Sequence, residues 1–420
     1  MDSPTLTLRP PRRSRCGGAL RVLALSLSIM AVTPAYSATL AEAIVAALQI
    51  EQQEARVAAL RGEGDAVRRQ AAQPIAANPA FRTKTVAAEP PGNLATYDLE
   101  SLIDLPLWMP GQRGARRAVA SALGGQAEAL ARLLRWEMAG RVREAVWTTA
   151  LAQGRLRQAA EALGSARSLE TAIGKRSAAG ELARMDLLVA RQDTLAREVD
   201  LQAARLDYDR ALKTYHHLTG LSVLPDAMVE RATVPSTDDA DPLTNHPLLL
   251  SSESAVVKAR ADRERVSSDR RGNPLLSVGL NRVRDGRGTA AADAMQLEVN
   301  IPIGLASQHA PVMAGAERAY TEQVTARQRT WLEAELALKT ARLEVTGAAE
   351  ALEVATRQEA VTRDAYRLVR RAFDLGESDL AIMLQAQERA RQASLNHELR
   401  RLEQGRAAAR LNQALGLVPE

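Results

Sequence analysis

The sequence has little cysteine and few aromatic residues. Its only cysteine among 420 residues is Cys16, so the rest of the chain can form neither a disulfide framework nor a thiolate metal site. Aromatic residues make up 3% of the chain, hydrophobic residues 46% and charged residues 25%. This apolar content argues against a disordered chain. Because Ala, Leu, Arg, Glu and Gln dominate, and all of them favour helices, the composition predicts long helices.

The excess of positive charge is confined to the first residues. The chain carries a net charge of +5 at pH 7, and residues 1–37 hold five arginines and one aspartate. The remaining residues are close to neutral, and their arginines are interleaved with Glu and Asp. Such mixed runs are typical of solvated helix faces, so no nucleic acid partner is predicted.

Residues 1–37 have the pattern of a secretory signal peptide. Basic residues over 9–21 precede the short apolar run 22–32, and Ala35-Tyr36-Ser37 fits a small-x-small cleavage site. A membrane anchor is the alternative, but the run is shorter than the ~20 residues that a spanning helix needs. We therefore expect export from the bacterial cytoplasm, with Ala38 as the new N-terminus.

Two long stretches contain no proline. They run from Pro110 to Pro225 and from Pro311 to Pro419, and because proline breaks helix interiors, they predict helices. A helix over 112–173 would be roughly 90 Å long, which predicts packing in a coiled coil or a helical barrel. Apolar residues at heptad-like spacing predict one such seam: Leu188, Leu195, Val199 and Leu206.

An internal repeat relates the two halves at an offset of 195–196 residues. Trp136 matches Trp331, Gly180-Glu181 matches Gly376-Glu377, and four further matches lie on the same diagonal. Six matches predict a tandem duplication. The predicted parts are a signal peptide over 1–37, repeat one over 38–220, a linker over 221–250 and repeat two over 251–420. In each repeat we expect a helix, a β-hairpin and a long helical pair, about 111–220 in the first and 305–415 in the second.

Each repeat contains one predicted β-hairpin. Residues 80–106 and 274–303 show period-two alternation around the turns Pro90-Pro91-Gly92-Asn93 and Asp285-Gly286-Arg287-Gly288. The strands have the length that a tilted strand needs to cross a membrane, and a soluble hairpin is the alternative. Four strands cannot close a barrel, and open edges are not viable in lipid. If the strands lie in a membrane, several chains must therefore share one barrel. Three chains would supply twelve strands. The predicted membrane-facing residues are Leu99, Ile103, Leu297 and Val299.

Four local motifs resemble the TolC family of outer-membrane efflux proteins. They are Thr39–Ala43, Pro110–Arg117, Ala179–Leu188 and Phe373–Leu380. The chain departs from the family at Gln385, where members often carry Asp, and at Pro110, where Gly is usual. Its short length resembles the heavy-metal, CzcC-type branch of the family.

The resemblance implies a fold, a function and partners. The fold is mainly α with a membrane β part, in which a homotrimer shares a twelve-stranded β-barrel and a long α-helical barrel. The function is the exit duct of a tripartite efflux pump in a Gram-negative outer membrane, with a large periplasmic part. The implied partners are a periplasmic adaptor (membrane fusion protein), an inner-membrane RND-type transporter and outer-membrane lipid. The sequence leaves the cargo open among heavy-metal cations, drugs and secreted polypeptides. A soluble periplasmic coiled-coil adaptor or scaffold and the duct of a type I secretion system are the alternatives.

The resemblance also implies that the helix tips hold the aperture and the adaptor contact. The tip residues are Arg176, Gly180, Glu181, Arg371, Asp374, Gly376, Glu377 and Asp379. At the two glycines we expect the left-handed backbone that lets a helix reverse. No catalytic residue, metal site or cofactor is predicted, and the chain is not expected to be an enzyme. His397-Glu398, for instance, lacks the second histidine of a zinc protease motif.

Overall fold

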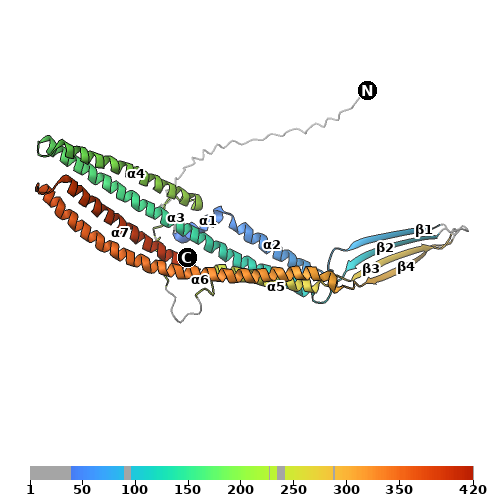
Figure 1. Cartoon of the computed structure of the whole chain (residues 1–420). Coiled ribbons are helices and arrows are strands. Elements are labelled where there is room, and N and C mark those ends of the chain that lie inside the picture. The colour runs from blue at the N-terminus through green and yellow to red at the C-terminus, as the bar shows by residue number, and fades with distance from the viewer. Residues whose placement is uncertain (1–38, 89–95, 227, 234–241, 287–288, 420) are drawn as a thin grey trace, which may run out of the picture. The chain divides into compact units, whose positions relative to one another are not determined.

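The structure of the chain is a computed structural model (Figure 1) that describes the following residues: 39–88, 96–226, 228–233, 242–286 and 289–419. The predicted signal peptide, the predicted turn over 90–93 and parts of the predicted linker and second turn lie outside them. The described residues are mainly helical, with one four-stranded sheet, as the predicted fold class requires. None of the described helices is long and apolar enough to cross a membrane.

The same order of elements occurs twice along the chain. Each half has a helical segment, two strands, a very long helix and a shorter helix. The first half contains α1 (Leu40–Ile50), α2 (Gln53–Ala72), β1 (Ala80–Ala88), β2 (Thr96–Pro106), α3 (Gln112–Ala178) and α4 (Arg184–Thr219). The second half contains α5 (Pro247–Ser268), β3 (Leu275–Arg284), β4 (Ala292–Asn300), α6 (Ala306–Asp374) and α7 (Leu380–Ala414).

Local sequence explains where several helices begin and end. Thr39 and Glu42 form a reciprocal capping box at the start of α1. In the first family-like motif, Thr39–Ala43, these two residues therefore serve to begin the helix. The residues that follow α4 and α7 include Gly220 and Gly416, with φ of +72° and +79°. Only glycine adopts this backbone without steric cost, which ends both helices at equivalent positions of the two halves.

The four strands form one antiparallel sheet in the order β1-β2-β3-β4. The central pairing, between β2 and β3, joins the two halves and sets Ile103 opposite Val278. The outer strands β1 and β4 each pair on one side only within the described residues. Figure 1 shows this sheet at one end of the long helices, beside α5 and the start of α6.

The long helices lie side by side in a defined lateral order. In the half that contains the shorter helices, α4 packs on α3, α3 on α7, and α7 on α6. Nearer the sheet the order is α2, α3, α5 and α6. The central row of α3 is buried as helical spacing predicts, with Leu134, Met138 and Val142 at most 5% exposed. Helix α4 packs on α3 and on α1, and α6 packs on α7 and α5, so α4 and α6 are the outer helices of this row in the described chain (Figure 1).

A buried arginine ties both halves and the linker together near the middle of the helices. Arg143 on α3 is 4% exposed, and its guanidinium donates to both carboxylate oxygens of Glu230 at 2.7 and 2.6 Å. It also donates to the carbonyl of Leu417, beyond α7, at 3.0 Å. Asn412 on α7 donates to Glu230 at 3.1 Å. Because each polar group of this network is hydrogen-bonded, the charged guanidinium of Arg143 can be buried without leaving an unpaired charge.

Candidate functional site

The two helix reversals lie next to each other at the end of the helices opposite the sheet. Gly180 and Gly376 have φ of +80° and +78°, the left-handed backbone expected at both turns. Behind the turns, Ile173 of the first half packs against Phe373 and Met383 of the second in one buried cluster. The two turns therefore form one double tip.

Arg176 is the residue that joins the two turns. Its side chain pairs with Glu181 across the first turn at 3.3 Å, and its guanidinium lies 5.4 Å from the ring centroid of Phe373 in the second half. A cation over an aromatic face is attracted to the ring quadrupole. Arg176 and Glu181 are thus engaged within the protomer.

The other charged residues predicted at the tip are exposed. Arg371, Asp374, Glu377 and Asp379 make no side-chain hydrogen bond or ion pair within the described part of the chain. Asp379 precedes α7 as its N-cap residue, but its side chain does not cap the helix. These four side chains are available to a partner.

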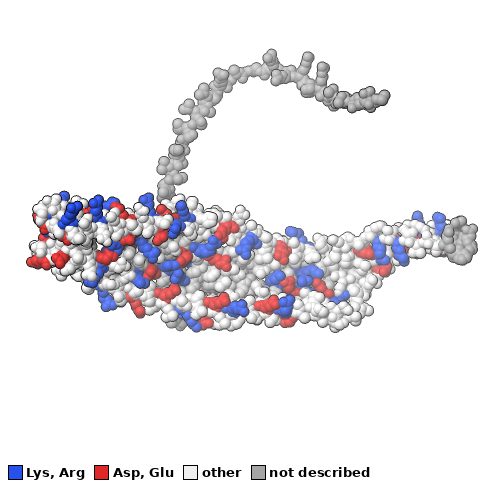
Figure 2. Space-filling model, turned by 45° about the horizontal axis from the view of Figure 1, so that its top comes forward, with Lys and Arg blue, Asp and Glu red and all other residues white. Residues whose placement is uncertain are grey.

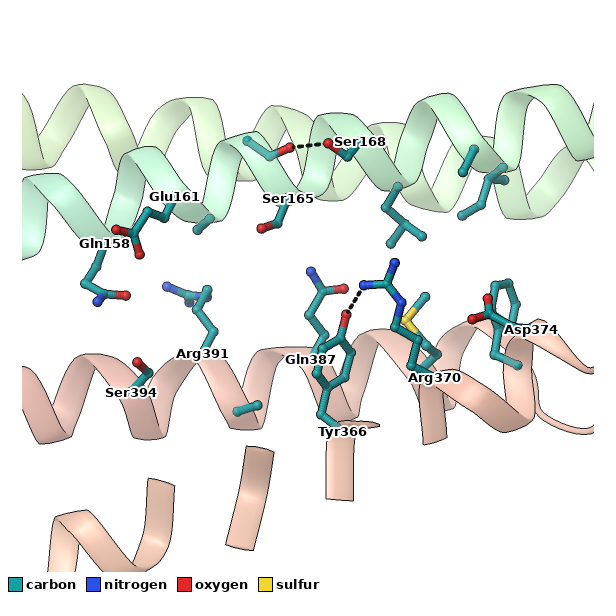
Figure 3. A pocket seen from close by; sticks show the side chains of 18 of the residues that line it. Gln158, Glu161, Ser165, Ser168, Tyr366, Arg370, Asp374, Gln387, Arg391 and Ser394 are labelled. Carbon is teal, nitrogen blue, oxygen red and sulfur yellow. Dashed lines mark hydrogen bonds between the residues drawn. The ribbon is translucent and has the colours of Figure 1, made fainter. Parts of the chain in front are cut away.

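A groove of about 780 Å³ runs behind the tip between the two halves, which sequence reasoning did not find. Figure 3 shows Glu161 and Ser165 on α3 facing Gln387 and Arg391 on α7, with Asp374 toward the tip. No local pattern signals this groove, because its walls come from segments about two hundred residues apart in sequence.

Some polar side chains of the groove have a partner within the protomer, and others do not. Arg391 donates to Glu388 at 2.9 and 2.6 Å, and this bond holds the pKa of Glu388 below its usual value against the opposing effect of partial burial. In contrast, Gln387 Oε1 is buried without a hydrogen-bond partner, and Glu161 pairs with no cation among the described residues. The groove therefore retains hydrogen-bonding capacity for a second molecule.

One face of the sheet is apolar and exposed. The register puts Phe81, Ile103, Val278 and Leu297 in one row across the four strands. Ile103, Leu297 and Val299 are 51%, 70% and 56% exposed. These three residues and Leu99 are the four predicted membrane-facing residues, and all four lie on this face.

The apolar face ends toward the hairpin turns. Leu99 is only partly exposed and pairs in register with Arg282, which forms an ion pair with Asp293 at 2.6 Å. Leu99 therefore lies at the margin of the apolar band, whereas Leu297 lies inside it.

The opposite face of the sheet is polar, and one network crosses it. The guanidinium of Arg82 on β1 lies 3.3 Å from carboxylate oxygens of Asp104 on β2 and of Glu298 on β4. It also donates to Ser277 on β3 at 3.3 Å, and Ser277 donates to Asp104 at 2.5 Å. One arginine thus links all four strands, so the polar face is ordered as well as hydrophilic.

Charges of both signs are mixed over the surface of the long helices. Figure 2 shows acidic and basic side chains mixed over the visible face of the helices. Within the described residues, no group of three or more His, Cys, Asp or Glu side chains could hold a metal ion. The double tip, its groove and the two-faced sheet are the candidate functional surfaces.

Comparison with known proteins confirms the resemblance drawn from the motifs. Residues 241–417 match the family model described as outer membrane efflux protein. No curated protein matches the chain in sequence.

Solved structures share the fold over most of the chain. CusC is similar with a TM-score of 0.73 at 14% identity, covering 90% of this chain and 92% of its own. The outer-membrane channel OprN is similar with a TM-score of 0.70 at 19% identity, covering 90% and 89%. The outer membrane protein VceC from Vibrio cholerae is similar with a TM-score of 0.69 at 15% identity, covering 91% and 97%. At these identities the likeness shows the fold, and it confirms the predicted TolC-like architecture.

Proposed function

We propose that the chain is the exit duct of a tripartite efflux pump in a Gram-negative outer membrane, because residues 241–417 match the model of the outer membrane efflux protein family. The sheet spans the outer membrane and the helices extend into the periplasm. The duct is passive, and it receives cargo from an inner-membrane RND-type transporter through a periplasmic adaptor. Three copies of the chain form the duct.

The unpaired edges of the protomer carry this proposal. The sheet has an apolar face suited to lipid and a polar face suited to a water-filled lumen, yet among the described residues β1 and β4 each lack a neighbour on one side. Unpaired backbone groups are costly in lipid, where no water satisfies them. Pairing β1 of one protomer with β4 of the next removes every open edge, and three protomers close a twelve-stranded barrel.

The helical part has matching open edges. The predicted seam on α4 is exposed, with Leu195 and Val199 57% and 69% exposed, and α6 on the other side of the protomer exposes Val361 and Leu368 at 69% and 70%. Burial of such side chains contributes roughly 1.5–3 kcal/mol each when complete. Packing α4 of one protomer against α6 of the next covers both stripes and closes the helical barrel.

Distances from the tip indicate which residues meet in this seam. Leu195 lies 15 residues beyond Gly180, and Val361 lies 15 residues before Gly376. Both are therefore roughly 22 Å from the double tip along their helices. We expect Leu195 of one protomer to contact Val361 of the next.

Cysteine cross-linking tests this seam. The only native cysteine, Cys16, lies in the predicted signal peptide, so a mature double variant Leu195→Cys/Val361→Cys carries no other thiol. Oxidation of outer membranes should convert this variant into a covalent trimer on a denaturing gel. The matched control is Leu195→Cys/Arg363→Cys, because position 363 is exposed but lies about 200° around α6 from position 361.

The control should stay monomeric on the gel. A covalent trimer in both variants would indicate random collision, and monomers in both would contradict the proposed contact between α4 and α6.

The double tip is the proposed docking site for the adaptor. The two turns lie together, four exposed charged side chains surround them, and the groove behind them keeps unpartnered polar groups such as Glu161 and Gln387. A helical hairpin of the adaptor would lie along this groove, with polar side chains toward these groups.

Heavy-metal cations are the first cargo to test, because the sequence resembles the heavy-metal branch of the family. A strain that lacks the chain should become more sensitive to divalent metals, and the plasmid-borne parent should restore resistance. Unchanged metal resistance together with increased drug sensitivity would assign the duct to a drug pump instead.

A further inference from the structure

The segments that connect the sheet to the long helices carry a concentrated positive charge. Residues 107–117, 269–274 and 301–309 contain five arginines and one acidic residue, a net charge of +4. The charged residues are Arg113, Arg116, Arg117, Asp269, Arg270 and Arg271. This contrasts with the helices, where both signs are mixed (Figure 2).

Only part of this charge is compensated within the protomer. Arg116 forms a bidentate pair with Asp269 at 3.1 and 3.3 Å, which uses the one carboxylate of these segments. Arg270 donates only to the backbone carbonyl of Ser267, at 3.1 Å. Arg117 and Arg271 have no side-chain partner among the described residues. These three exposed arginines, Arg117, Arg270 and Arg271, are called the basic collar below.

The turn that carries Arg270 and Arg271 is held in place by close packing. A Cβ added to Gly304 would lie 2.5 Å from the carbonyl oxygen of Arg270, so only glycine lets the two segments approach. The Asn273 side chain donates to the carbonyl of Leu107 at 2.9 Å and to the fully buried Gln112 at 2.7 Å. The backbone of the turn that carries Arg270 and Arg271 therefore has a fixed position relative to the strands.

Apolar and aromatic side chains adjoin the collar. Ile301, Ile303 and Leu305, between β4 and α6, are 64%, 89% and 62% exposed. Trp108 lies at the equivalent place after β2, and the guanidinium of Arg116 is 4.9 Å from its ring centroid. Exposed aliphatic residues beside tryptophan and arginine are typical of the interface between hydrocarbon and lipid headgroups.

We propose that the basic collar binds the phosphate groups of anionic phospholipids in the periplasmic leaflet of the outer membrane. This rests on the proposed function, which puts the sheet in that membrane. The arginines lie at the helix-facing end of the strands, where headgroups would meet the protein, and guanidinium groups pair well with phosphate oxygens. Three protomers would present nine such arginines around the duct and fix its depth in the membrane.

Lipid binding to the purified complex tests the collar. Native mass spectrometry of the detergent-extracted protein would be recorded with added dioleoyl-phosphatidylglycerol or dioleoyl-phosphatidylcholine. The parent should bind the anionic lipid more tightly. Arg270→Gln/Arg271→Gln should weaken that binding roughly 30-fold, at about fivefold per arginine, and leave phosphatidylcholine unchanged. Arg117→Gln, on α3 outside the turn, should weaken it about fivefold on its own.

The matched control is Arg400→Gln/Arg401→Gln, an adjacent pair on α7 with 44% and 62% exposed side chains. This pair lies away from the strands and should leave the affinity unchanged. An equal loss in the control, or no loss in either collar variant, would overturn the proposal. Displacement of the lipid by millimolar inorganic phosphate would assign the site to free phosphate instead. The mass of each complex is recorded in the same spectra, so failure to form trimers would count against the proposed function and not against the collar.

Discussion

Gly405 on α7 lets the two halves of the protomer approach each other, and its replacement should be costly. A Cβ at this position would overlap Cη2 of Trp147 on α3 and lie 2.9 Å from Cζ3. Trp147 is 2% exposed, so its ring is enclosed by the surrounding helices. Overpacking of this kind costs typically about 1–3 kcal/mol. The overlap with Trp147 puts the cost at the upper end of this range, and the better helix propensity of alanine offsets about 1 kcal/mol, so Gly405→Ala should lower the free energy of unfolding by about 2 kcal/mol.

The assay is thermal loss of the helical circular dichroism signal in detergent, at one fixed scan rate because unfolding of such a protein can be irreversible. Gly62→Ala is the matched control, because a Cβ on this exposed residue of α2 meets nothing within 4 Å. The control should keep or raise the midpoint, while Gly405→Ala lowers it. Adding Trp147→Phe should recover part of the loss. A midpoint for Gly405→Ala at or above that of the parent would refute the packing described for α3 and α7.

Four further outcomes are expected. Burial lowers the pKa of His246 from 6.5, and its neutral Nδ1 accepts the N–H of Leu248 at the start of α5. The folded chain then binds fewer protons than the unfolded one, so thermal stability should fall as the pH drops below about 6.5. His246→Asn should flatten this dependence, because asparagine can also cap the helix but does not titrate. Leu297→Arg should destabilise membrane insertion by roughly 2–4 kcal/mol, measured by carbonate extraction, whereas Gln296→Arg on the polar face should insert normally. A bulky residue at Gly376, where φ is +78°, should abolish export in a complementation assay without loss of trimer on a native gel. Arg143→Ala should leave Glu230 buried without its cation and lower the unfolding midpoint by an amount equivalent to about 3–5 kcal/mol.

Features with a local signal could be predicted from the sequence. Period-two alternation indicates strands because side chains on a strand alternate between its faces, and Ile103, Leu297 and Val299 do lie on one exposed face. The glycines of the two tips were visible because a reversal between long helices needs a left-handed residue, and the internal repeat showed the same residue at both places.

Features made by distant segments could not be predicted in the same way. Arg82 on β1 bonds to Ser277 and Glu298, which lie 195 and 216 positions later in the chain. No pattern in the sequence near Arg82 predicts these partners. Arg143 likewise reads as one charge among many on a long helix, although it is buried against the linker and the end of α7. The predicted seam on α4 was visible as a pattern, but the sequence did not show that this helix lies at the edge of the protomer.

The number of chains in the complex tests the central claim most directly. Within the described residues, β1 and β4 each have one unpaired edge and α4 and α6 carry exposed apolar stripes; in the proposed duct, three copies of the chain cover these edges and close both barrels. The measurement is the mass of the complex extracted from the outer-membrane fraction in mild detergent. We predict three copies of the chain without its signal peptide. A single copy, or recovery of the protein from the soluble periplasm, would contradict the proposed duct.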